Sequence, residues 1–264
     1  FQRARLALTD LAAPQDVLEQ GITAYESLRD QVGDNLDIAF LGGYIELRRG
    51  NTQKGLDLLR HVFENTRSTE SLLGYTDALW AVGMQRTAMD TLERWLEAHP
   101  QDTRALIAKG NYFLMAGEYA DAATDLQQAK TRGADHAWMD ASLAYVLAKS
   151  GDMGTAEPLA REALKASPND TMALNALGLV AMGRGDPRGA VKLLEEAIDT
   201  KTGSAPLSLQ LDYAEALAAA GDMAQARRIA EQVQAQLPST SPLPCRSHRR
   251  VREYASSATR AKHG

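Results

Sequence analysis

The sequence predicts an all-α fold, an α-solenoid of about seven helix-turn-helix units, and three observations lead to this prediction. Glycines recur at steps of 33 to 36 residues. Ala, Leu, Glu, Gln and Arg are abundant, and β-branched residues never run in alternating blocks, which favours helices over strands. Prolines follow three of the repeats, at Pro100, Pro168 and Pro238. A repeat near 34 residues with a helical composition is typical of stacked helical hairpins.

Each repeat is expected to turn at its glycine. Glycine readily adopts the left-handed backbone that ends a helix, and an Asp or Asn after it, as in Gly151-Asp152, is suited to cap the next helix. In the last unit but one, Pro187 is expected at the first position of its helix, where a missing N–H does no harm. The recurring turn glycines are Gly50, Gly83, Gly117, Gly151, Gly185 and Gly221.

A small residue lies five positions after each turn glycine, inside the expected second helix. Its size allows the first helix of the hairpin to approach closely, and a mostly apolar residue follows seven positions later. The small residues are Gly55, Ala88, Ala122, Ala156, Ala190 and Ala226, and the later residues are Val62, Trp95, Ala129, Ala163, Ala197 and Val233.

These spacings predict one array over residues 1–238, with a less regular first unit that lacks the turn glycine. Residues 239–264 carry six Lys/Arg and one Glu, and we expect this basic tail to be disordered or to form a weak terminal helix. Because the sequence begins at Phe1, we expect a processed chain or a piece of a longer array. The predicted units are about 2–35, 36–68, 69–102, 103–136, 137–170, 171–206 and 207–238.

Composition and motifs argue against several function classes. The formal net charge is −5, so without the basic tail the body carries −10, which argues against nucleic-acid binding. No apolar run approaches the ~18 residues of a membrane span. The single cysteine, Cys245, and the scattered histidines form no metal-ligand motif, and no phosphate loop or nucleophile elbow appears. We therefore predict no catalytic residues, no metal and no cofactor.

The repeat resembles the tetratricopeptide repeat (TPR). The unit at 171–206 shows the likeness best, although the family's aromatic residue at the fourth position is absent. The resemblance implies a right-handed solenoid whose first helices line a concave groove that binds a peptide or protein segment. The matching residues of that unit are Leu174, Leu177, Gly178, Ala181, Ala190, Leu194 and Ala197.

The family's groove positions, transferred to this sequence, predict a peptide-binding surface that is rich in aromatic residues and methionines. The alternative is that Trp80, Trp138 and Tyr145 are packed between neighbouring helices. The predicted groove residues are Phe40, Tyr44, Leu47, Leu73, Asp77, Trp80, Arg104, Asn111, Leu114, Met115, Trp138, Tyr145, Lys149, Asn175, Leu179 and Met182.

Residues 76–236 are also similar to the C-terminal repeats of bacterial lipoproteins that accompany PEP-CTERM and exosortase systems. The similarity rests on the segments 95–100 (WLEAHP) and 112–119 (YFLMAGEY), followed by the later Gly-Asp turns. It implies an envelope-associated, periplasm-facing scaffold in exopolysaccharide production or protein sorting. Two alternatives are a cytosolic adaptor and the regulatory arm of a larger enzyme. The ligand and the oligomeric state do not follow from the sequence.

Overall fold

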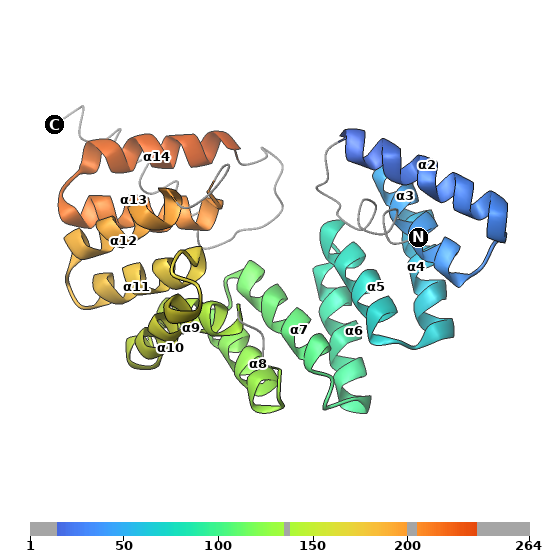
Figure 1. The fold of residues 1–264 in the computed structure, drawn as a ribbon, viewed down its shortest axis with the longest axis horizontal. Helices are drawn as coiled ribbons and strands as arrows, with labels where there is room; N and C mark the ends of the chain where they lie inside the picture. The colour runs from blue at the N-terminus through green and yellow to red at the C-terminus, as the bar shows by residue number, and fades with distance from the viewer. Residues whose placement is uncertain (1–14, 135–137, 200–204, 237–264) are drawn as a thin grey trace. The chain divides into compact units, whose positions relative to one another are not determined.

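The computed structural model describes residues 15–134, 138–199 and 205–236, which form thirteen helices and no strand (Figure 1). The chain divides into two compact units: unit 1 from Phe1 to Ala108 and unit 2 from Lys109 to Gly264. Within the predicted unit 2–35, the first of the two helices lies outside the described residues, as does the basic tail.

Unit 1 consists of successive antiparallel helices joined by short turns. The predicted segments 36–68 and 69–102 each hold two helices. The helices are α2 (Gln15–Val32), α3 (Leu36–Arg48), α4 (Thr52–Thr66), α5 (Thr69–Ala81), α6 (Gln85–Ala98) and the first part of α7 (Thr103–Ala116).

Unit 2 repeats the same pattern. Each of its hairpins combines a first helix with a second helix, and α9, α11 and α13 are the first helices of three successive hairpins. The helices after the remainder of α7 are α8 (Tyr119–Thr131), α9 (Met139–Ser150), α10 (Met153–Ala166), α11 (Thr171–Gly183), α12 (Pro187–Asp199), α13 (Leu207–Ala220) and α14 (Met223–Gln236).

The turns between paired helices have the expected conformation. All six turn glycines have positive φ, and Gly151 (φ 99°) closes the C-terminus of α9. The Asp152 carboxylate then accepts the Thr155 N–H at 3.1 Å and caps α10. Asn51 is an exception to the capping prediction. Its side chain makes no cap and instead donates to Glu46 Oε2 at 2.8 Å.

Small residues let the helices of a hairpin touch. A Cβ added at Gly55 would lie 2.7 Å from the Gly43 carbonyl oxygen, so only glycine fits between α3 and α4. Ala156 and Ala190 occupy the equivalent position in unit 2 with no exposed surface. Close packing of this kind leaves the first helices side by side, and it is these helices that carry the predicted groove residues.

Candidate interaction surface

In unit 1 the predicted groove residues form a partly exposed apolar row on α3 and α5. Phe40 and Leu47 on α3, and Leu73 and Trp80 on α5, are each neither fully buried nor fully exposed. Within each helix these residues are seven positions apart, so they share one helical face. Asp77 lies between Leu73 and Trp80 on the same face of α5 and is exposed.

Tyr44 supports this row from beneath. Only 3% of its surface is exposed, its ring meets Phe40 edge to face at 5.3 Å, and its hydroxyl donates to the Gly74 carbonyl at 3.2 Å. Burial raises the pKa of Tyr44, and the carboxylates of Asp77 and Glu70 raise it further, so the phenol stays protonated as a donor. Tyr44 therefore contributes packing between α3 and α5 rather than free surface.

Away from this face, Asp102 joins three elements of unit 1. Its Oδ2 accepts hydrogen bonds from the Thr69 hydroxyl at 2.6 Å and the Trp95 indole at 2.8 Å. Its Oδ1 accepts the N–H groups of Arg104 and Ala105, both at 3.1 Å, and so caps α7. Burial acts to raise the pKa of Asp102, but these hydrogen bonds outweigh it and the pKa is lowered. Arg104 itself, another predicted groove residue, is exposed.

In unit 2 the middle of the first-helix face is filled by the protein's own polar side chains. Asp212 of α13, which sequence analysis did not single out, is 2% exposed. Its carboxylate pairs with the Lys149 ammonium from α9 and accepts the Asn175 amide from α11 at 3.2 Å and the Tyr145 hydroxyl from α9 at 3.4 Å. Tyr145 and Asn175 are each 3% exposed. Three predicted groove residues thus meet here, as a buried network and not as an open surface.

The Lys149 ammonium has further partners in this network. It lies 5.8 Å from the ring centroids of both Tyr119 and Tyr145, and these two rings meet edge to face at 6.4 Å. Burial acts to lower the pKa of Lys149, but the Asp212 carboxylate raises it above its usual value. Burial raises the pKa of Asp212, although Lys149 acts in the opposite direction. The carboxylate therefore depends on its lysine when it is ionised.

The remaining predicted groove residues of unit 2 divide into two groups. Leu179 and Met182 are partly buried and pack against apolar clusters of their own unit. Trp138, at the start of α9, is 42% exposed, and Met115, near the end of α7, is 57% exposed. The last two residues of the set, Asn111 and Leu114 on α7, are partly exposed.

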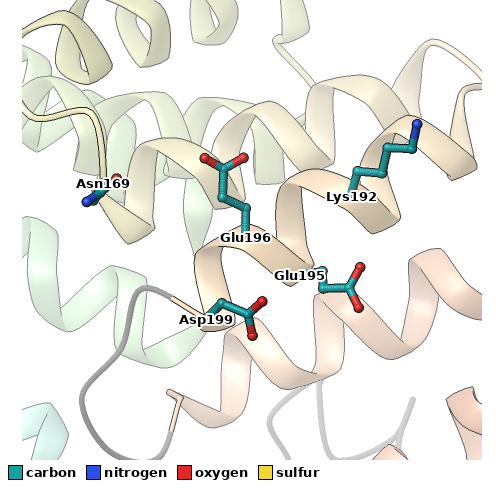
Figure 2. Close-up of a pocket in the computed structure, with 5 residues that line it drawn as sticks. All are labelled: Asn169, Lys192, Glu195, Glu196 and Asp199. Atoms are coloured by element: carbon teal, nitrogen blue, oxygen red, sulfur yellow. The ribbon is translucent and has the colours of Figure 1, made fainter.

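A separate shallow hollow of about 560 Å³ lies along α12, where Lys192 is one of its lining residues. Figure 2 shows the carboxylates of Glu195, Glu196 and Asp199 along the helix, with Asn169 on the turn before α11. Within the described ranges, no group of three or more His, Cys, Asp or Glu is placed to hold a metal ion. None of the helices that the structure describes is long and apolar enough to cross a bilayer.

Comparison with known families agrees with this architecture. Two family models described as "Tetratricopeptide repeat" match the chain, one over residues 77–137, 107–171 and 141–205, and the other over 181–243. The chain belongs to the tetratricopeptide repeat family. TPR proteins are in general scaffolds for contacts between proteins. No curated protein matches the sequence closely enough to count as a relative.

Solved TPR structures share the fold at low sequence identity. A tetratricopeptide repeat protein from Parabacteroides merdae ATCC 43184 is 14% identical, with a TM-score of 0.67 over 98% of this chain and 100% of that chain. PilW, described as a widely conserved type IV pilus biogenesis factor, is 14% identical with a TM-score of 0.59 over 85% and 98%. Pseudomonas aeruginosa PilF is 15% identical with a TM-score of 0.55 over 86% and 97%. The α-solenoid fold class is thereby confirmed.

Proposed function

We propose that this TPR chain is a non-catalytic scaffold that binds a peptide or protein segment on the first-helix face of unit 1. The observation that carries the proposal is the row of Phe40, Leu47, Leu73 and Trp80 on α3 and α5, whose side chains stay partly accessible. Apolar side chains gathered on one face favour a partner site, and aromatic residues are the usual energetic anchors of such sites.

The chemistry of the face indicates the kind of segment it suits. The edge of the Phe40 ring lies against Gly74, where an added Cβ would be 2.4 Å from Phe40 Cε2, so the ring lies close to the backbone of α5. Asp77 places a carboxylate within the same row. An extended or helical segment with apolar side chains fits this surface. The acidic body of the chain gives no support for a nucleic-acid partner.

Selection from a random-peptide display library against the full chain tests this proposal. Enriched peptides are then measured by calorimetry against the wild type, Phe40→Ala, Trp80→Ala and the control Met89→Ala. Met89 is a partly buried residue of α6, outside the row. We expect the control to bind like the wild type, and each aromatic variant to lose about 30-fold in affinity, as for an interface anchor. Peptides that bind both aromatic variants at full affinity, with native helix content, would refute the assignment.

We also propose that the protein works in a bacterial envelope system for exopolysaccharide production or protein sorting. The similarity of residues 76–236 to the repeats of PEP-CTERM-associated lipoproteins supports this placement. The start of the intact gene product decides it. A signal peptide with a lipid-attachment cysteine is expected. A short cytosolic start would favour the adaptor, and a catalytic domain would favour the regulatory arm of an enzyme.

A further inference from the structure

The polar network of unit 2 spans three hairpins. Lys149 and Asp212 are 63 positions apart, and α9 and α13 belong to hairpins that are separated by a whole hairpin, α11 and α12. Asn175 on the intervening α11 donates to the same carboxylate. Since side chains of α9 and α13 meet over α11, the layer of first helices is concave on this side. The contact therefore closes the inner face of unit 2.

The closed face is held by a charge that is costly to bury. Asp212 has 1% of its side chain exposed and Lys149 has 14%. Taking both ions out of water offsets much of their attraction, whereas a buried ion without its partner is strongly unfavourable. Asn175 Oδ1 is buried and has no hydrogen-bond partner among the described residues. The cost of burying these polar groups nearly cancels the attraction between them. The closed arrangement of α9, α11 and α13 therefore depends on the charge state of the network, whereas apolar packing would favour it under all conditions.

We propose that Lys149 and Asp212 form a releasable latch, which closes the inner face of unit 2 only while the negative charge of Asp212 is neutralised. Lys149 neutralises it in the structure, and a proton on Asp212 is an equivalent substitute. Release of the latch separates α9 from α13 and uncovers Tyr145 and Asn175, two residues that the repeat pattern places in the groove. The proposal does not rest on the peptide site of unit 1.

The other ionisable groups around Asp212 stay constant in the test. Tyr119 from α8 and Tyr145 from α9 contribute phenols, and Glu215 contributes a second carboxylate from α13 that also acts on Asp212 and Lys149. All three are retained in every variant, so differences between variants report the latch alone.

The experiment measures the distance between the outer helices α10 and α14 by pulsed electron resonance on the full chain. Spin labels are placed at Lys165→Cys and Gln232→Cys, two exposed positions, with Cys245→Ser to remove the native thiol. In this background the wild type, Lys149→Met, Lys149→Met/Asp212→Asn and Lys130→Met are compared. Lys130 pairs with Asp140 between α8 and α9 and serves as the matched ion-pair control.

We expect the labelled wild type and Lys130→Met to show one short distance at about pH 8 and at about pH 4.5. Lys149→Met is expected to show a longer, broader distribution at about pH 8 and to return to the short distance at about pH 4.5, where Asp212 becomes protonated. The double variant should be short at both values, because its residue 212 carries no charge.

Two results would overturn the latch. One is a short distance for Lys149→Met at the higher pH, which would make the lysine dispensable. The other is a long distance for the double variant, which would mean that the charge of Asp212 is not the cause of opening. If Lys149→Met loses helix at the higher pH, circular dichroism replaces the distance as the readout. Recovery of helix in acid and in the double variant then supports the latch, and absence of recovery rejects it.

Discussion

In unit 1, the first helices α3 and α5 present Phe40, Leu73 and Trp80 to their surroundings, and the Tyr44 hydroxyl beneath them donates to a backbone carbonyl. In unit 2, Asn175 of α11 has the repeat position of Phe40 and Leu73, ten residues before the turn glycine, but it is buried and donates to Asp212. The difference teaches that repeat position alone does not decide whether a side chain faces a ligand. The side chains that the neighbouring helices contribute decide it.

The largest expected effect breaks the closed face of unit 2. Lys149→Met leaves Asp212 buried without its counter-ion, and we expect the free energy of unfolding at neutral pH to fall by about 3–4 kcal/mol. Lys130→Met should cost under about 1 kcal/mol, because that pair is much more exposed. Urea denaturation followed by circular dichroism measures both. Equal losses in the two variants would contradict the special role of the buried pair.

A pair of glycine substitutions sharpens the comparison. Gly178→Ala would place a Cβ 2.7 Å from Leu194 Cγ, and Leu194 has no exposed surface into which it could move. The resulting overpacking exceeds the gain in helix propensity, so we expect a loss of about 1–2 kcal/mol. Gly74→Ala instead meets the outer edge of the Phe40 ring.

Because Phe40 is partly exposed and can swing away, the stability of Gly74→Ala should stay within about 1 kcal/mol of the wild type. Its affinity for unit 1 peptides should fall, since the added methyl group displaces the Phe40 ring from its position against α5. Thermal unfolding measures the first effect and calorimetry the second. A Gly74→Ala protein with unchanged peptide affinity would weaken the assignment of Phe40 as an anchor.

The smallest expected effect is a difference in pH dependence between two aspartates. The lowered pKa of Asp102 means that its contribution to stability is present above its unfolded pKa of about 3.9 and is lost as pH falls through the lowered value. The raised pKa of Asp212 makes its contribution to stability depend on pH in the opposite direction. Its contribution is fully present below about 3.9 and is lost as pH rises through the raised value.

Asp102→Asn and Asp212→Asn test these signs. At neutral pH we expect Asp102→Asn to lose about 1 kcal/mol through weaker hydrogen bonds, and Asp212→Asn to lose about 2–3 kcal/mol, because it leaves the largely buried Lys149 ammonium without its carboxylate. Toward acid, the deficit of Asp102→Asn should shrink, whereas the deficit of Asp212→Asn should grow. Unfolding free energies at several pH values between about 3 and 7 measure both trends. Parallel trends in the two variants would show that one of the two signs is wrong.

The sequence predicted the hairpins because their cause is local. A glycine at the turn and a small residue five positions later act within one repeat, and Gly151 and Ala156 have the expected roles. The network at Asp212 depends on contacts 37 to 67 positions away, which no local period encodes. The sequence signal for this network was Asp212, a lone Asp among the apolar residues of α13. The pattern of turn glycines and small residues did not include it. Tyr145 and Asn175, which were predicted as groove residues, are buried in the structure for this physical reason.

The distribution of tryptophans gives each unit its own optical behaviour. Trp80 and Trp95 lie in unit 1, where the Trp95 indole is bound to Asp102 and stacked on His99 with centroids 3.9 Å apart. Trp138, in unit 2, is 42% exposed in the native protein. Indole emission of the native protein thus reports chiefly on unit 1, while far-ultraviolet dichroism weighs every helix. The difference between the melting curves from indole emission and from far-ultraviolet dichroism will reveal the order in which the two units unfold, without any added dye.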